Sequence, residues 1–351
     1  MSKDYRYAII GTGFPWGDVR KTGFGMAHSH WENFSKTGRI DLVAISDLNI
    51  EAANNFKSRW KTEAKHYFDY KEMLKVENPE IVSVTTWPHL HAEMTIAAFE
   101  AGVKAVHCEK PMATKWGDAK RMKEVADAHG GKLTFGHQRR FIHLFQAVRQ
   151  AIREGEIGEL VQIEATVGDL FDWGTHWLDM MFFYNEETPA EWVIGQIDSR
   201  TEKKVFGAYM ENQAVSHFKF KNGVRGILIV GHEAEIGCVH RIIGKDGMIE
   251  VLSERKMRIL GKNQVGWKEI EIPQEPLSEW ELAPLDVIRQ LDEPGYKSLL
   301  SVDYAIQHTE LIFGTYLSSQ LRARVDLPIP YDGNALLDML EKNEIGPGRG
   351  L

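Results

Sequence analysis

The stretch YAIIGTG, residues 7–13, gives the clearest indication of the fold of this chain. It begins as a short apolar run of the kind that makes a buried β-strand, and it ends in the glycine-rich turn Gly11-Thr12-Gly13. Glycine in such a turn lets the backbone approach a diphosphate closely, and the N-terminus of the following helix favours its negative charge. The stretch therefore predicts the first strand of a sheet that binds a dinucleotide at its carboxyl edge.

The same alternation of short apolar runs and amphipathic stretches continues to about residue 140. Strands that alternate with helices form parallel sheets, so the pattern predicts a Rossmann domain, a doubly wound parallel α/β sheet, over residues 1–140. The predicted strands are Tyr7–Gly11, Asp41–Ser46, Glu80–Thr85, Val103–Cys108 and Lys132–Gly136. The predicted helices are His28–Lys36, Ile50–Trp60, Tyr70–Val76, His91–Ala101 and Lys115–His129.

Beyond residue 140 the pattern changes to longer β-like runs. The turns Lys221-Asn222-Gly223 and Lys245-Asp246-Gly247 are of the type that joins adjacent antiparallel strands. Residues 141–351 are therefore predicted to form an α+β domain with a large, mostly antiparallel open sheet and a helix near 299–322 that packs back on the body. The predicted strands are Leu160–Val167, Trp192–Asp198, Gln213–Lys219, Arg225–Val230, Arg241–Gly244 and Met248–Leu252.

Composition excludes several classes of partner. The net charge of −8 over 351 residues argues against nucleic-acid binding, and no segment reaches the roughly 18 consecutive apolar residues that a membrane helix needs. Cys108 and Cys238 are too few and too far apart for a disulfide framework or a structural zinc site, so we expect a cytoplasmic protein. Asp169, His232 and Glu233 match no recognised metal-ligand spacing, and no metal site is predicted.

The glycine-rich turn departs from the usual dinucleotide fingerprint on its C-terminal side. A third glycine is expected three residues after the second, but Phe14, Pro15 and Trp16 stand there instead. The sequence therefore predicts an inserted loop over Phe14–Phe24, which is either a lid over the cofactor or plain surface. Gly25 is then the displaced third glycine.

An acidic residue follows Gly25 at the distance that ribose binding requires. Asp47 lies 22 residues later, where a carboxylate accepts hydrogen bonds from the adenosine ribose. A carboxylate there repels a 2′-phosphate, which favours NAD over NADP. Arg20 or Lys21 in the inserted loop could bind a 2′-phosphate, so NADP stays an alternative. The other interpretation of Asp47 is a cap for the helix that starts near Ile50.

Three residues that lie later in the chain predict redox chemistry. Lys110 follows an apolar strand, in Glu109-Lys110-Pro111, and Asp172 and His176 lie four residues apart. Removing hydride from a secondary alcohol requires a base for the hydroxyl proton, and His176 is the natural candidate. Asp172 is predicted to orient the imidazole or to bind a neighbouring hydroxyl, and Lys110 to donate a hydrogen bond to the reacting oxygen. The simpler interpretations are a helix N-cap for Asp172, a structural role for His176 and a surface position for Lys110.

The ordered set of motifs resembles the glucose-fructose oxidoreductase / inositol dehydrogenase (Gfo/Idh/MocA) family over nearly the whole chain. The motifs are Gly11-Thr12-Gly13, Asp47, TTWPHLH at 85–91, Glu109-Lys110-Pro111, Gln138-Arg139-Arg140-Phe141 and Asp172-Trp173-Gly174-Thr175-His176. The resemblance implies a Rossmann domain, a C-terminal domain whose open sheet often forms the oligomer interface, and NAD(P)-dependent oxidation or reduction of sugars and polyols. It assigns similar roles to Lys110, Asp172 and His176, and it leads us to expect a homodimer or homotetramer. The inserted loop departs from the family's pattern.

The remaining predicted contacts surround these residues. Thr86 and Pro88 are expected to line the cofactor at a strand end, where open α/β sheets bind ligands. Trp173 is expected to stack on a sugar ring, and Asp179 to contact the substrate from the His176 helix face. The full cofactor set is Gly11, Thr12, Gly13, Gly25, Asp47, Thr86, Pro88, His91, Glu109, Lys110, Pro111 and Arg139. The substrate set is Lys110, Asp172, Trp173, His176 and Asp179.

The predicted function is hydride transfer between NAD(P) and a secondary hydroxyl or ketone of a sugar, polyol or glycoside. One alternative is an enzyme of the same fold that retains NAD and uses transient oxidation for elimination or glycosidic cleavage. The other is a sensor that binds NAD(P) or a sugar without chemistry. The presence of both Lys110 and His176 argues against the sensor, because binding alone needs no base beside a lysine.

Overall fold

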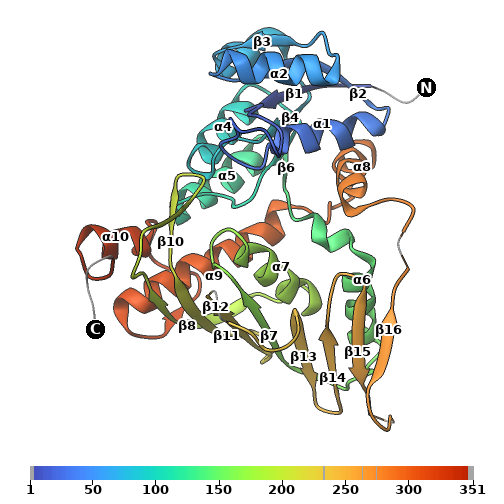
Figure 1. Cartoon of the computed structure of the whole chain (residues 1–351), viewed down its shortest axis with the longest axis vertical. Coiled ribbons are helices and arrows are strands. Elements are labelled where there is room, and N and C mark those ends of the chain that lie inside the picture. The colour runs from blue at the N-terminus through green and yellow to red at the C-terminus, as the bar shows by residue number, and fades with distance from the viewer. Residues whose placement is uncertain (1–3, 232–233, 263, 274, 347–351) are drawn as a thin grey trace.

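In the computed structural model, which describes residues 4–231, 234–262, 264–273 and 275–346, two sheets with their helices lie at opposite ends of the chain's long axis (Figure 1). The residues considered for a metal include His232 and Glu233, which lie outside these ranges, as does the tail 347–351. Within the described ranges, no helix is long and apolar enough to cross a membrane.

The N-terminal sheet is parallel, with the strand order β3-β2-β1-β4-β5-β6. Its strands are β1 (Tyr5–Ile10), β2 (Ile40–Ser46), β3 (Lys65–Tyr67), β4 (Ile81–Val84), β5 (Ala105–Cys108) and β6 (Lys132–Phe135). Because β1 pairs with β2 on one side and with β4 on the other, the strand order reverses between β1 and β4. Ligands bind at such a reversal, outside the carboxyl ends of the strands. The predicted Rossmann sheet is confirmed.

Helices alternate with these strands along the chain. They are α1 (Met26–Lys36), α2 (Ile50–Trp60), α3 (Tyr70–Glu77), α4 (Pro88–Glu100) and α5 (Trp116–Ala128). Helix α1 begins at Met26, directly after Gly25 and two residues before the predicted start at His28, so the loop Phe14–Phe24 lies outside it. Helix α2 is capped by Asn49, whose side chain accepts hydrogen bonds from the N–H groups of Glu51 and Ala52. Asp47 is therefore not the cap of α2.

The second sheet is mixed, with the order β16-β15-β14-β13-β7-β12-β11-β8-β17. Its strands are β7 (Leu160–Val167), β8 (Ala190–Asp198), β11 (Gln213–Phe220), β12 (Arg225–Val230), β13 (His240–Gly244), β14 (Met248–Val251), β15 (Lys256–Leu260), β16 (Lys268–Glu271) and β17 (Val325–Asp326). β7 and β12 pair in parallel and the other neighbours are antiparallel. The mostly antiparallel sheet is confirmed, and both predicted turns join paired strands.

The helices of the second half pack on this sheet and near the junction of the two halves. They are α6 (His143–Arg153), α7 (Gly174–Tyr184), α9 (Val302–Leu321) and α10 (Ala335–Glu341), and a 3₁₀ helix spans Gln138–Phe141. Helix α9, predicted near 299–322, is bonded directly to β8. The hydroxyls of Ser318 and Ser319 accept hydrogen bonds from the N–H groups of Gly195 and Ile197 (2.8 and 3.1 Å).

Helix α8 (Glu279–Asp292) returns to the first half, where it lies beside α1 (Figure 1). Its Val287 and Ile288 are buried in the same apolar cluster as Tyr7 and Phe34. The sequence pattern did not predict α8, and a domain boundary near residue 140 stays a prediction. A segment assigned to the second domain thus contributes to the core of the first.

A short arm rises from the second sheet toward the N-terminal half (Figure 1). It consists of β9 (Lys203–Val205) and β10 (Ala208–Met210), which pair as a small antiparallel sheet of their own. The chain enters the arm from β8 and leaves it into β11. The arm places Phe206 and Gly207 at its tip.

Candidate active site

A cavity of about 770 Å³ lies at the carboxyl ends of β1, β2, β4 and β5 and extends to α7. This volume is typical of a site for a cofactor or another small molecule. Residues of both halves line the cavity, so the site forms between them. The residues of the two predicted sets that line it are Gly11, Thr12, Gly13, Gly25, Asp47, Thr86, Pro88, Glu109, Lys110, Arg139, Trp173 and His176.

The glycine-rich turn has the close approaches that glycine permits. Gly11 has φ +89°, and a Cβ there would lie 2.5 Å from Cγ2 of Thr86. Gly25 has φ +64°, and a Cβ there would lie 2.4 Å from the carbonyl oxygen of Phe14. The inserted loop therefore folds back so that Gly25 lies against its first residue, immediately before α1.

Asp47 supports this turn through hydrogen bonds to its backbone. Oδ2 accepts hydrogen bonds from the N–H groups of Thr12 and Gly13 (2.8 and 3.0 Å) and from the hydroxyl of Thr12 (2.8 Å). Oδ1 accepts a hydrogen bond from the N–H of Asn49 at 2.8 Å. The side chain also lines the cavity. Asp47 thus shapes the turn, and its binding of a ribose stays a prediction.

Lys110 reaches into the cavity from the end of β5 and pairs with Asp172. Its Nζ donates a hydrogen bond to Oδ1 of Asp172 at 2.5 Å, and the two side chains are 13% and 2% exposed. Lys110 lines the cavity, whereas Asp172 lies behind it. Nζ also lies 5.6 Å from the ring centre of Trp173, which is partly exposed in the cavity wall. A buried carboxylate therefore holds the ammonium with the cavity in front of it.

His176 lies in the first turn of α7 and lines the same cavity as Lys110. Burial lowers the pKa of the imidazole well below its usual range, and the nearby Lys110, His137 and Arg139 lower it further. The ring is consequently neutral near pH 7. A neutral imidazole at the cavity wall can accept a proton from a bound hydroxyl.

The predicted partnership between Asp172 and His176 is not what the structure shows. The carboxylate of Asp172 turns to Lys110, and Nδ1 of His176 has no hydrogen-bond partner among the described residues. The N–H groups of Asp172 and Trp173 both donate to Oδ1 of Asp169 at 2.8 Å, and α7 begins after Trp173. Asp172 therefore neither orients the imidazole nor caps the helix, and it contacts Lys110 instead.

Glu109 has a buried partner that the sequence did not indicate. Oε1 lies 2.9 Å from Nε2 of His30, and Nδ1 of His30 lies 2.9 Å from the hydroxyl of Ser83. Burial alone would raise the pKa of Glu109, but the hydrogen bond and charge of His30, together with Lys110, lower it to about 2. Glu109 is therefore an ionised carboxylate at the cavity wall, and His30 of α1 holds it in place.

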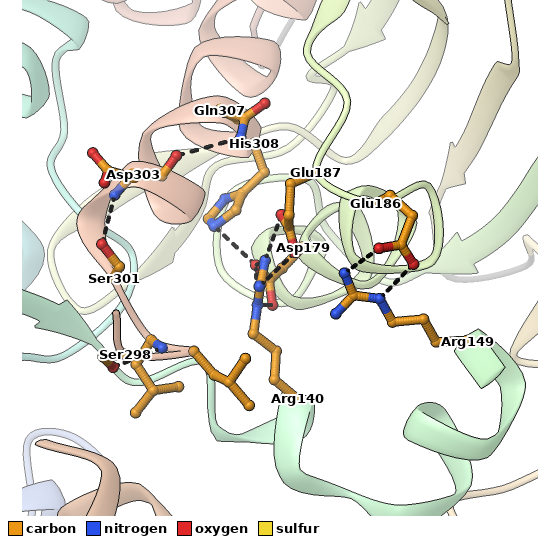
Figure 2. A network of polar contacts seen from close by, with 12 residues as sticks. Arg140, Arg149, Asp179, Glu186, Glu187, Ser298, Ser301, Asp303, Gln307 and His308 are labelled. Atoms are coloured by element: carbon orange, nitrogen blue, oxygen red, sulfur yellow. Dashed lines mark hydrogen bonds and ion pairs between the residues drawn. The ribbon is translucent and has the colours of Figure 1, made fainter. Parts of the chain in front are cut away.

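Asp179 lies behind the cavity, where it pairs with Arg140 (Figure 2). The guanidinium of Arg140 donates to both oxygens of Asp179 at 2.7 to 3.0 Å and to Glu187 at 2.8 Å, and it is fully buried. Asp179 is 1% exposed and does not line the cavity. The predicted substrate contact is therefore not formed, because Arg140 occupies both carboxylate oxygens.

Three imidazoles lie next to this pair, and of these His137 and His308 are stacked whereas His137 and His176 are tilted by 50°. The ring of His137 lies 4.5 Å from that of His308 and 5.5 Å from that of His176. The hydroxyl of Thr175 lies 3.2 Å from Nε2 of His137 and 3.1 Å from Nδ1 of His308. Ligand atoms of His137, Asp179 and His308 all lie within 4.8 Å of one another, but a cation there would compete with Arg140 for Asp179. Burial lowers the pKa of His137 and of His308, so both rings are neutral.

Two more predicted cofactor residues support the cavity from outside. His91 is fully buried, and its ring nitrogens lie 2.8 Å from the carbonyl oxygen of Pro111 and 3.0 Å from that of Thr86. Neither His91 nor Pro111 lines the cavity. His91 instead bridges the segments that follow β4 and β5, because it contacts a backbone carbonyl of each. Arg139 does line the cavity, 4.9 Å from the ring centre of Trp177.

Comparison with family models assigns the N-terminal part of the chain. Residues 5–137 match the oxidoreductase family with an NAD-binding Rossmann fold, Gfo/Idh/MocA. The match ends at His137, immediately before the 3₁₀ helix, which α6 and then β7 of the second sheet follow.

Similar proteins align over more of the chain. An inositol 2-dehydrogenase/D-chiro-inositol 3-dehydrogenase from Halalkalibacterium halodurans is 26% identical, over 86% of this chain and 90% of that protein. A myo-inositol 2-dehydrogenase from Thermotoga maritima is 27% identical, over 68% of this chain and 75% of that protein. The solved structure of a levoglucosan dehydrogenase, in complex with NADH and levoglucosan, superposes with a TM-score of 0.79 over 93% of this chain and all of that one, at 19% identity. The fold of both halves is thus shared with a known structure.

Proposed function

The chain belongs to the Gfo/Idh/MocA family of oxidoreductases, and we propose that it transfers hydride between NAD and a secondary hydroxyl or ketone of a sugar or polyol. The observation that carries this proposal is the position of Lys110 and His176 in the wall of the cavity that begins at the glycine-rich turn. Gly11 and the strand ends would hold the dinucleotide, and its nicotinamide would then lie toward Lys110 and His176 in the same cavity. The inositol dehydrogenases aligned above support the substrate class.

When bound, NAD supplies the hydride acceptor for the substrate carbon. His176 takes the hydroxyl proton, since its neutral ring carries a free lone pair. Lys110 donates a hydrogen bond to the same oxygen and stabilises the negative charge that develops there. In the reverse direction, protonated His176 returns the proton to the new hydroxyl.

Asp172 acts in this scheme as a positioning residue for Lys110. Its carboxylate lies behind the ammonium at 2.5 Å and is 2% exposed, so it does not reach the substrate in this arrangement. The pair fixes the direction of the Lys110 side chain, because a buried carboxylate needs a charged partner. Trp173, in front of the pair and partly exposed, offers a flat surface for a sugar ring.

We also propose a preference for NAD over NADP, a homodimer or homotetramer formed through the second sheet, and a reducing, cytoplasmic location. Asp47 supports the cofactor preference, since its carboxylate lines the cavity near the turn and repels a 2′-phosphate. Both cysteines are free, which fits a reducing compartment.

The test is a screen of inositols, sugars and glycosides with NAD and NADP side by side, read as formation of reduced nicotinamide and as a thermal shift. We expect a shift with NAD and turnover with at least one polyol. The Gly11→Val variant is the control, because a side chain there collides with Thr86 and should abolish the shift. A wild-type protein that neither shifts with either cofactor nor reduces one contradicts the proposal.

A further inference from the structure

We propose that the inserted loop and the β9–β10 arm form a clasp that gates entry and release of the dinucleotide. The clasp consists of Trp16 and Phe24 on the loop and Phe206 at the tip of the arm. All three side chains line the cavity. The inference rests on the proposed function, because it concerns the same cofactor site.

The arm is anchored firmly at its base. Nζ of Lys203 donates a hydrogen bond to the carbonyl oxygen of Gly168 at 3.0 Å. Glu211, which follows β10 and is fully buried, accepts hydrogen bonds from the N–H of Leu170 (2.5 Å) and the hydroxyl of Tyr316 (2.7 Å). The base therefore belongs to the second half, next to the segment that leads into α7, and only the tip extends to the other side.

The tip is a two-residue turn in which both residues have positive φ. Phe206 has φ +49°, which is unfavourable for a bulky residue, and Gly207 follows with φ +75°. A Cβ at Gly207 would lie 2.9 Å from the ring of Trp87, so this position also needs glycine for space. Positive φ at both residues is what a two-residue hairpin turn between Val205 and Ala208 requires, so the turn fixes the direction in which Phe206 projects.

Aromatic contacts join the tip to the inserted loop. The rings of Phe24 and Phe206 meet edge to face with centroids 5.2 Å apart, and Trp16 stacks on Phe24 at 5.1 Å. Nζ of Lys21 lies 3.3 Å from the ring centre of Trp16. Trp16 nevertheless stays 65% exposed, so these rings are not part of a buried hydrophobic core. The contact between the loop and the arm can therefore open without disrupting a core.

The tip touches both walls of the crevice. Phe206 meets the loop that follows β1, and Gly207 lies against Trp87, which follows β4. The strand order reverses between β1 and β4, where a dinucleotide crosses from its adenosine to its nicotinamide end. A cofactor in this position passes beneath the tip, so the rings of Phe24 and Phe206 must part when it enters or leaves.

A gate and a simple ligand contact predict different kinetics. If Phe206 is part of a gate, shortening it accelerates both association and dissociation, because both require the clasp to open. If Phe206 only contacts the bound cofactor, shortening it accelerates dissociation alone. The two rate constants therefore separate the two roles.

The experiment is stopped-flow binding of NADH to the full-length protein, with dissociation measured by chase with excess NAD. We expect Phe206→Ala and Phe24→Ala each to raise both rate constants by roughly tenfold, the equivalent of one aromatic pair, with a much smaller change in Kd. Val19→Ala is the matched control, because Val19 lies in the same loop, is 99% exposed and does not line the cavity.

Unchanged rate constants in both variants, or faster dissociation with unchanged association, overturn the gate. The two variants lie on different segments, so a folding defect in one leaves the other informative. A wild-type protein that binds no NADH contradicts the proposed function itself, which is a separate outcome.

Discussion

The two ends of the cavity are built by different physical means. At the end near α7, buried ion pairs set the geometry, since Asp172 holds Lys110 and Arg140 holds Asp179. At the end near β1, backbone hydrogen bonds to Asp47 and close approaches at Gly11 and Gly25 set it. The difference follows from the ligand each end is proposed to meet, because proton transfer needs side chains and a diphosphate needs backbone N–H groups.

The comparison implies that substitutions at the two ends fail in different measurements. A change at the end near α7 should reduce turnover or the stability of the fold and leave NADH binding intact. A change at the end near β1 should weaken NADH binding or alter its association and dissociation rate constants, and it should leave the chemical step intact.

The largest effect is expected for His176→Ala. Loss of the base should reduce kcat by about 10²- to 10⁴-fold, with the NADH Kd unchanged. Steady-state kinetics and a binding titration measure the two quantities. His129→Ala, at an exposed histidine, should change neither. If the variant lost both NADH binding and turnover, this would contradict the proposal that the end near α7 serves catalysis and not NADH binding.

Next is the stability of the buried pair behind the cavity. Arg140→Leu leaves the carboxylates of Asp179 and Glu187 without their buried partner, so the free energy of unfolding should fall by about 3–5 kcal/mol. Arg153→Ala removes an exposed pair with Glu186 and should cost about 0–1 kcal/mol. Denaturant unfolding of both variants gives the comparison, and equal losses would contradict it.

At the other end, Gly25→Ala should weaken NADH binding by roughly tenfold or more. The new methyl group collides with the carbonyl oxygen of Phe14, and φ of +64° is unfavourable for alanine. Gly38→Ala is a matched control, because Gly38 has φ +62° but no atom within 4 Å of the new Cβ. Gly38→Ala should lose about 1 kcal/mol of stability because of its φ alone, Gly25→Ala should lose more because of the collision, and only Gly25→Ala should change the Kd. Equal Kd values for the two would refute the steric argument.

The smallest effect concerns pH. The folded pKa of His308 lies well below its ordinary value of 6.5, so below about pH 6.5 the unfolded chain binds a proton that the folded chain does not. Stability therefore falls as pH falls, by up to about 1.4 kcal/mol per pH unit for this group. His308→Gln should make the dependence shallower by that amount. Denaturant unfolding of the wild type and of His308→Gln at a series of pH values measures the two slopes, and equal slopes would contradict this prediction.

Much of the fold was predictable because its patterns are local. The apolar runs of β7 and β12 and the periodicity of α2 match the structure to the residue. The elements that the sequence pattern missed are short or depend on distant contacts. The arm strands have three residues each, too few for a periodic signal, and α8 packs on a helix more than 240 residues earlier.

Site residues were predictable where a sequence motif marks the end of a strand. They were not predictable where the hydrogen-bond partner lies far away in the sequence. Lys110 and His176 line the cavity as expected. The partner of Glu109 is His30, 79 residues away, and the only local signal was a pair of histidines after Gly25. Asp179 was placed by helical periodicity, but α7 is buried on nearly all sides, so its spacing does not identify a cavity face.

Lys110 and His176 are proposed to act on the substrate oxygen at the end of the cavity near α7. The most direct test is single-turnover hydride transfer by Lys110→Ala, with NADH binding measured on the same preparation and Lys115→Ala, at an exposed lysine, as the control. We expect wild-type NADH binding and hydride transfer that is slower by at least about 100-fold. Hydride transfer at the wild-type rate, with binding intact, would contradict it.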